Sequence, residues 1–264
     1  MDIMKNRWSD HRLKLLVLAA LLSTSAAFAV DDQLVAAAFS SLRPGNTPPA
    51  GWSPLAAANI KIHTRYTLVD DNGTTVLRAD SEAGASGLSR KLRVDPATLP
   101  WLRWRWKIGN LIETADLRSK AGDDFPARIY VIFDYPLDKL PFFERNKLRV
   151  ARALFDPDLL AATLCYVWDG KAAVGTIASS AYTNRVKIIV VESGSAQVRQ
   201  WVDMERNINR DFRAAFGEDA PPVSAIAVAT DTDNTGTFAT AFFGDISFNK
   251  HGLTGDPPPA STKP

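Results

Sequence analysis

The chain has 264 residues, 46% of them hydrophobic and 23% charged, a globular composition that excludes disordered, collagen-like and multi-span membrane proteins. The first 29 residues carry four basic and two acidic side chains, which leaves 27 of each sign in the rest of the chain. A neutral chain lacks the clustered positive charge that nucleic acids and anionic bilayers attract, so we expect neither as a partner.

Residues 1–29 have the pattern of a secretory signal peptide. Basic residues precede the apolar run Leu15–Leu22, and the small residues Ala27 and Ala29 fit a cleavage site. The apolar run is too short to cross a bilayer, which takes about 20 residues. We therefore expect a periplasmic or secreted protein that starts near Val30 and has no membrane insertion after signal cleavage.

The next segments predict a short helix followed by many strands. Residues Asp31 to Ser41 suit a short helix, which the stretch Pro44–Pro49 ends. Beyond it, alternating runs and runs rich in β-branched and aromatic residues predict strands, often joined by turns such as Asp70-Asp71-Asn72-Gly73. These strands are expected at Ile60–Val69, Thr75–Ser81, Gly87–Val94, Trp101–Ile108, Ala127–Tyr135, Thr163–Trp168, Ala173–Ala178, Arg185–Val191, Val223–Thr230 and Ala239–Phe248.

One long helix interrupts the strands. Apolar residues between Val198 and Phe216 recur at steps of three and four, ahead of Gly217, which predicts a packed amphipathic helix near residues 198–216. A shorter helix is expected at Leu148–Leu154. Because strands and helices do not alternate regularly, the fold class indicated is all-β, an antiparallel β-sandwich of jelly-roll type. We expect one domain over residues 30–251 and a disordered, proline-rich tail over residues 252–264.

A basic ladder lies on one predicted strand. In Trp101–Ile108 the apolar residues should face the core, which places Arg103, Arg105 and Lys107 together on the opposite face. Three neighbouring cations repel one another unless carboxylates or an anionic ligand offset their charge. This face is therefore a candidate binding surface.

A second polar group stands at the strand that begins near residue 127. Asp123 and Asp124 precede this strand, and Arg128 and Tyr130 share its polar face. If this strand neighbours the basic ladder, the two sets form one surface whose guanidinium groups suit a carboxylate, with Trp168 as an exposed ring. Such a surface could bind an acidic sugar or organic acid. It could equally be an internal salt-bridge network, and the sequence leaves both open.

The segment Asp231-Thr232-Asp233-Asn234-Thr235-Gly236 resembles the first half of an EF-hand loop. Phe242 stands where that loop needs its bidentate Glu, so a calcium site would have to be built differently. Hard oxygen ligands for it are Asp231, Asp233, Asn234 and Asp245. The alternative is a polar turn whose side chains bond their own backbone. Apart from calcium, no cofactor is expected.

Sequence signatures of enzymes are scarce. After the signal only His63 and His251 occur, which leaves little material for His-based triads or two-His metal sites. No P-loop, G-x-S-x-G elbow or G-x-G-x-x-G motif is present. Carboxylate pairs of the glycosidase type stay open, because their spacing is spatial rather than sequential.

Several blocks in order resemble a bacterial exported family known as domain of unknown function 3047. The blocks are WRWKI, GDDFPARIYVIFD, YVWDG, TNRVKIIVVESG, WVDMERNINRDFRAAFG and DTDNTGTFATAFFGDISF. The resemblance as a whole extends over about Phe39 to Phe248. The resemblance implies no established activity. It marks Arg105, Lys107, Asp123, Asp124, Arg128, Tyr130, Trp168, Asn184, Arg185, Arg206, Asn207, Asp231, Asp233, Asn234 and Asp245. More loosely, the chain is similar to galactose-binding-type jelly rolls and carbohydrate-binding modules, a likeness of fold that does not fix function.

These observations favour a noncatalytic protein that binds a carbohydrate or similar polar ligand of the cell envelope. The expected ligand-binding residues are Arg103, Arg105, Asp123, Asp124, Arg128, Tyr130 and Trp168. One alternative is a lyase or hydrolase acting on envelope glycans, using Asp123 or Asp124 with Tyr130 or an arginine. The other is a structural or interaction protein of the periplasm.

Overall fold

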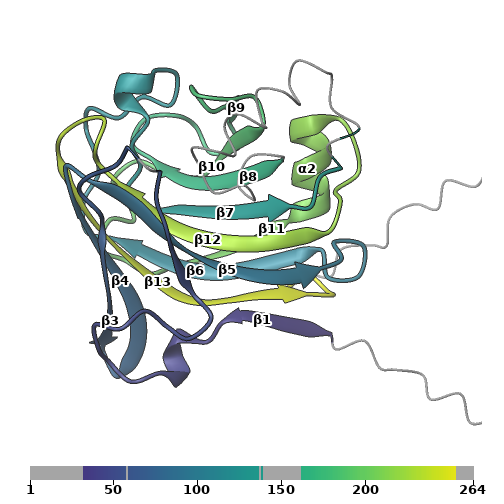
Figure 1. Ribbon diagram of the computed structural model, residues 1–264, viewed down its shortest axis with the longest axis horizontal. Coiled ribbons are helices and arrows are strands. Elements are labelled where there is room, and N and C mark those ends of the chain that lie inside the picture. Colours follow the sequence, from purple (N-terminus) through teal and green to yellow (C-terminus); the bar gives the residue numbers. More distant parts are fainter. Residues whose placement is uncertain (1–31, 58, 137, 139–161, 254–264) are drawn as a thin grey trace, which may run out of the picture. The chain divides into compact units, whose positions relative to one another are not determined.

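The computed structural model describes residues 32–57, 59–136, 138 and 162–253 (Figure 1). The predicted signal peptide, the predicted helix at Leu148–Leu154 and residues 254–264 of the predicted tail lie outside these ranges. None of the helices in the described ranges has the length and apolar character that a membrane-spanning segment requires.

The described residues form two β-sheets with a shared core between them (Figure 1). The first sheet consists of β1 (Gln33–Ala37), β3 (Arg65–Asp71), β4 (Thr74–Glu82), β6 (Trp101–Ile108), β11 (Val202–Asn207) and β13 (Phe238–Asn249). Its order is β11-β6-β13-β4-β3, and β1 pairs with the second half of β13. The second sheet consists of β2 (Ser53–Leu55), β5 (Ala85–Val94), β7 (Arg128–Phe133), β8 (Thr163–Asp169), β9 (Ile177–Ser179), β10 (Val186–Ser193) and β12 (Val223–Asp231).

The second sheet has the order β2-β5-β12-β7-β8-β10-β9. Of its strand pairs only β8 and β10 run parallel, and the pairs of the first sheet are antiparallel in the described residues. The predicted all-β sandwich is therefore confirmed. The turn predicted at residues 70–73 joins β3 to β4, where Asn72 and Gly73 both have positive φ, as tight hairpin turns require.

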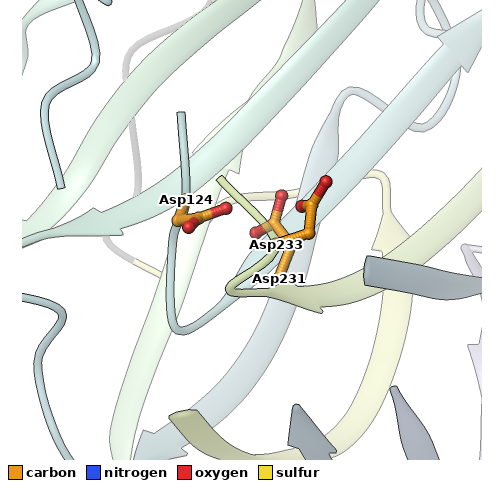
Figure 2. A group of neighbouring side chains, drawn as sticks. All are labelled: Asp124, Asp231 and Asp233. Atoms are coloured by element: carbon orange, nitrogen blue, oxygen red, sulfur yellow. The ribbon is translucent and has the colours of Figure 1, made fainter. Parts of the chain in front are cut away.

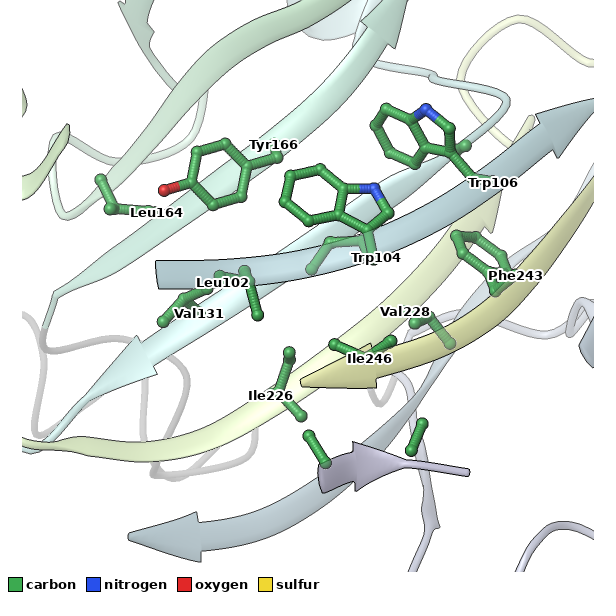
Figure 3. Packing of buried hydrophobic residues seen from close by; sticks show 14 of the residues in the cluster. Leu102, Trp104, Trp106, Val131, Leu164, Tyr166, Ile226, Val228, Phe243 and Ile246 are labelled. Carbon is green, nitrogen blue, oxygen red and sulfur yellow. The ribbon is translucent and has the colours of Figure 1, made fainter. Parts of the chain in front are cut away.

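The alternation predicted for β6 sets the core. Its even-numbered residues, Leu102, Trp104, Trp106 and Ile108, are buried, and its odd-numbered residues are half-buried on the outer face. Trp104 stacks on Tyr166 of β8 with ring centroids 5.3 Å apart (Figure 3). The core therefore contains aromatic rings from both sheets. Stacked pairs of this kind stabilise the packing of the two sheets beyond the burial of their area.

Strand β8 is buried along its whole length because both of its faces are covered. Tyr166 and Trp168 face the core, whereas Cys165 and Val167 belong to a second apolar cluster on the outer face of the second sheet. The segment that precedes β7 contributes Leu117 and Phe125 to this cluster, together with Ile188 and Val190 of β10. This cover buries residues of the second sheet that would otherwise face solvent.

The helix α2 (Ile208–Phe216) begins and ends where local chemistry requires it. The side chain of Asn207 accepts a hydrogen bond from the backbone N–H of Arg210, and Gly217 ends the helix with a φ of 78°. Phe212 packs on Phe133 of β7 with ring centroids 4.6 Å apart. The predicted packed helix is confirmed in this half of its range.

Three secondary-structure predictions are wrong over much of their range. The strand predicted at Ala173–Ala178 is mostly a turn, and β9 begins only at Ile177. Residues 202–207 form β11 rather than part of the helix, because they pair with residues 101–106 of β6. The predicted helix at residues 31–41 is strand β1 followed by a short 3-10 helix, Phe39–Ser41, since residues 33–37 pair with β13. In the latter two segments pairing with a neighbouring strand outweighed local helical preference.

Candidate functional site

The two polar sets expected to share one surface lie on opposite sides of the sandwich. Arg103 and Arg105 of β6 lie on the outer face of the first sheet, whereas Arg128 and Tyr130 of β7 belong to the second sheet. The predicted common surface is therefore wrong. The expectation of an exposed ring at Trp168 is also wrong, because its side chain is fully buried and packs on a core indole.

Arg128 is the centre of a buried ion-pair network. Its Nε and Nη2 donate to the two carboxylate oxygens of Asp231 at 2.8 and 2.5 Å. Nη2 also donates to the backbone oxygen of Asp123 at 2.5 Å, and the Asp123 carboxylate lies 3.4 Å away. The guanidinium stacks on Phe125, 4.4 Å from the ring centroid. Since Arg128 is only 4% exposed, these contacts form the internal network that the sequence left open.

Three carboxylates gather beside this network (Figure 2). Asp124, Asp231 and Asp233 each place an oxygen within 4.8 Å of the others, a spacing that a divalent cation could use. Asp124 is fully buried and accepts hydrogen bonds from the backbone N–H groups of Asn234 and Thr235 at 3.3 and 2.7 Å. The loop after β12 is thereby tied to the segment before β7.

Burial raises the pKa values of Asp231, Asp123 and Asp233. It raises the pKa of Asp231 to about 7, and the charge of Arg128 opposes the rise. Burial is also the main cause of the raised pKa values of Asp123 and Asp233, with a further contribution from the neighbouring charge of Asp124. Protons thus offset part of the crowded negative charge near neutral pH.

The four predicted calcium ligands do not meet at one point. The side-chain amide of Asn234 donates to the hydroxyl of Tyr182 at 3.0 Å. Asp245 lies in the other sheet, on β13, and accepts hydrogen bonds from the backbone N–H and the hydroxyl of Ser40. Asp231 and Asp233 do lie together, but their third neighbour is Asp124 rather than Asn234 or Asp245. Asp124 was predicted as a ligand-binding residue, not as a calcium ligand.

An open groove of about 630 Å³ lies on the outer face of the first sheet. It is lined by residues of β6, β11 and β13 together with parts of the N- and C-terminal described segments. Its polar lining includes Ser40, Arg103, Arg105, Asp203, Glu205 and Asp245, and its apolar lining includes Val35, Met204 and Leu253. The volume of this groove lies within the roughly 300–1,000 Å³ that small-molecule sites measure.

Asp203, Glu205 and Trp201 were not predicted as site residues, because the sequence pattern indicated a helix over residues 198–216. Their alternation with Val202 and Met204 has period two, a signal for a strand that could have found them. In the structure Glu205 accepts from Nε of Arg103 at 2.6 Å. The guanidinium carbon of Arg105 lies 4.3 Å from the centroid of the Trp201 ring.

The comparisons with known proteins agree with the family resemblance seen in the sequence. No curated protein matches the chain. A family model described as "Protein of unknown function (DUF3047)" matches residues 50–247, which is most of the chain and covers the groove strands β6 and β11 as well as the acidic cluster. The chain therefore belongs to the DUF3047 family.

Proposed function

We propose that the protein binds a carbohydrate or similar polar ligand in the groove on the outer face of the first sheet. One observation carries the proposal: this groove is open and combines guanidinium donors, carboxylate acceptors and short apolar stretches. Sugars present hydroxyl groups that both donate and accept, together with apolar ring faces, so they suit such a mixed lining.

The other polar centre supports ligand binding less well. In the Arg128 network the guanidinium is already matched with carboxylates and lies beneath the second apolar cluster. The enzyme alternative relies on Asp123 or Asp124, which are 5% and 0% exposed. A catalytic carboxyl group must come within hydrogen-bond reach of its substrate. We therefore place the ligand at the groove, with export to the cell envelope as the expected setting.

The experiment is a glycan array probed with the purified chain, followed by titration calorimetry on the best ligand. Replacing Ser247, a groove residue that pairs with Arg103, by Trp should fill the groove and reduce binding at least about tenfold. The control is Ser179→Trp on the exposed strand β9 of the other sheet, which should bind as the unaltered chain does. Equal binding by both variants, each with an unchanged melting temperature, would reject the groove as the site.

A further inference from the structure

Among the residues that the structure describes, the basic side chains on the outer face of the first sheet are paired with carboxylates, with one exception. The matched pairs are Arg78–Asp80, Lys107–Asp71 and Arg103–Glu205, with nitrogen-to-oxygen distances of 2.8, 2.6 and 2.6 Å. In the part of the chain that the structure describes, Arg105 makes no ion pair and no hydrogen bond through its side chain. Its guanidinium stacks on the Trp201 ring, and its charge also acts at longer range on Asp71, whose pKa it helps to lower.

The strand register places a carboxylate opposite Arg105, but the two side chains form no ion pair. Asp203 stands directly opposite Arg105 on β11, just as Glu205 stands opposite Arg103. Arg103 and Glu205 form their cross-strand ion pair, whereas Arg105 and Asp203 do not. Asp203 is exposed and likewise has no ion-pair partner among the described residues.

Gly244 and Trp201 account for this difference. Gly244 lies where the pairing of β13 with β6 is interrupted, and the Arg105 side chain runs across it. A Cβ at residue 244 would stand 2.5 Å from Cγ of Arg105, so only glycine leaves room for this path. The guanidinium then lies against the Trp201 indole, and this arrangement leaves both Arg105 and Asp203 available to the groove that they line.

A stacked guanidinium is suited to one kind of ligand group. The indole covers one face of the guanidinium. The N–H donors of the guanidinium lie in its own plane, where they match the two oxygens of a carboxylate. Asp203 can accept hydrogen bonds from ligand hydroxyls. The full lining carries two arginines against three carboxylates, Asp203, Glu205 and Asp245. This balance disfavours a doubly charged phosphate group relative to a singly charged carboxylate.

We propose that the groove recognises a carboxylate-bearing sugar, such as a uronate residue of a glycan. Arg105 binds the carboxylate of that sugar, and Asp203 accepts a hydrogen bond from one of its hydroxyl groups. This inference rests on the proposed function and narrows it, because it names the ligand class and the two residues that select it.

The test compares trigalacturonate with neutral galactotriose by titration calorimetry on the purified chain. Free galacturonate and acetate serve as additional arms, since they distinguish a glycan-borne carboxylate from any carboxylate. We expect trigalacturonate to bind at least about tenfold more tightly than galactotriose, because a bidentate charged hydrogen bond contributes this much or more. Acetate should compete poorly with trigalacturonate, because it lacks the hydroxyl groups from which Asp203 would accept hydrogen bonds.

The variants Arg105→Gln and Arg105→Lys distinguish the bidentate hydrogen bonding of the guanidinium from its positive charge, because lysine keeps only the charge. Arg105→Gln should abolish the preference for the acidic sugar, and Arg105→Lys should restore only part of it. Arg213→Gln on the exposed side of α2 is the control and should leave the preference intact. Melting temperatures establish that each variant is folded.

The outcomes distinguish the two proposals. Equal binding of the acidic and neutral trisaccharides, or an undiminished preference in Arg105→Gln, would overturn this inference and leave the proposed function standing. Acetate as strong a ligand as trigalacturonate would also overturn the assignment to a sugar. Absence of binding to every glycan would overturn both.

Discussion

Arg128 shows how a single buried cation determines the stability of its surroundings. Its guanidinium satisfies Asp231 through two hydrogen bonds and the backbone oxygen of Asp123 through another. Replacing Arg128 by Met would leave buried carboxylates without a counter-charge, which costs about 3–5 kcal/mol in the free energy of unfolding. The loss should be larger at pH 8 than at pH 5, where protons neutralise Asp231. Denaturant unfolding at both pH values measures it.

The control for this prediction is Arg213→Met, which removes an arginine of α2 that pairs with Asp219 at the surface. Both side chains of that pair are more than half exposed, so the change should stay within about 0.5 kcal/mol. A loss at Arg128 no larger than at Arg213 would contradict the account of the buried network.

The raised pKa of Asp231 predicts a pH dependence of stability with a definite sign. Because its pKa in the folded chain is about 7, the folded state binds this proton more tightly than the unfolded state does. The free energy of unfolding should therefore fall as the pH rises from about 4 to about 7, by at most about 1.4 kcal/mol per pH unit from this group. Asp71 and Asp80 have lowered pKa values and contribute the opposite slope, only below about pH 4.

Unfolding measured across this range in Asp231→Asn tests the assignment. Asparagine does not titrate, so the slope should become shallower by about one proton between pH 4 and 7. Asp123 and Asp233 retain their own raised pKa values and keep part of the slope. An unchanged slope in the variant would show that Asp231 is already ionised throughout the range.

At the scale of elements, the sequence predicted strands well where alternation meets a one-sided core. For β6 the predicted and observed bounds coincide, because its even-numbered residues face the core and its odd-numbered residues face outward. The strand β11 was not predicted, because Trp201, Val202 and Glu205 also fit the three- and four-residue steps of a helix. Only pairing with β6 decides between these patterns, and a single sequence does not show that pairing.

Strand pairing, which a single sequence does not show, also explains which site predictions were right and which were wrong. Arg103 and Arg105 were correctly placed on one outer face because alternation within a strand is local. Their grouping with Arg128 and Tyr130 required knowing which strands are neighbours, and β6 and β7 belong to different sheets. The burial of Arg128 depends on the segment before β7 folding over the second sheet, which no local pattern in that segment indicates.

The junction between β11 and α2 offers a test at this scale. Asn207 ends the strand and caps the helix through its side chain, so Asn207→Ala should cost about 1 kcal/mol in the free energy of unfolding. Asn207→Asp should retain most of the stability, because aspartate caps equally well and favours the helix N-terminus. Thermal melts of the two variants suffice, and equal melting temperatures for both would contradict the capping role.

The loop after β12 allows a matching test for calcium. Asp231 already accepts hydrogen bonds from Arg128 and from the backbone of Phe125, and Asp124 accepts two from the loop backbone. We expect these bonds to satisfy the carboxylates as a polar turn does, so the melting temperature should be the same with calcium and with a chelator. A calcium-dependent rise at pH 8 that Asp233→Asn abolishes would instead establish a cation site at Asp124, Asp231 and Asp233.

At the scale of the whole molecule, the two outer faces of the sandwich differ in their chemistry. The second sheet is covered by its own loops and the second apolar cluster, and its charges cancel inside. The first sheet leaves its outer face open between β1, β6, β11 and β13, where the groove contains Arg105, which makes no ion pair among the described residues. This asymmetry is why we assign recognition to one face.

The most direct measurement is a two-dimensional amide NMR titration of the labelled chain with trigalacturonate. The account predicts that the largest shift changes map to β6, β11 and the Gly244–Asp245 region of β13, with the indole N–H of Trp201 among them. Changes that map instead to Asp124, Arg128 and the loop after β12, with the groove strands unaffected, would contradict it.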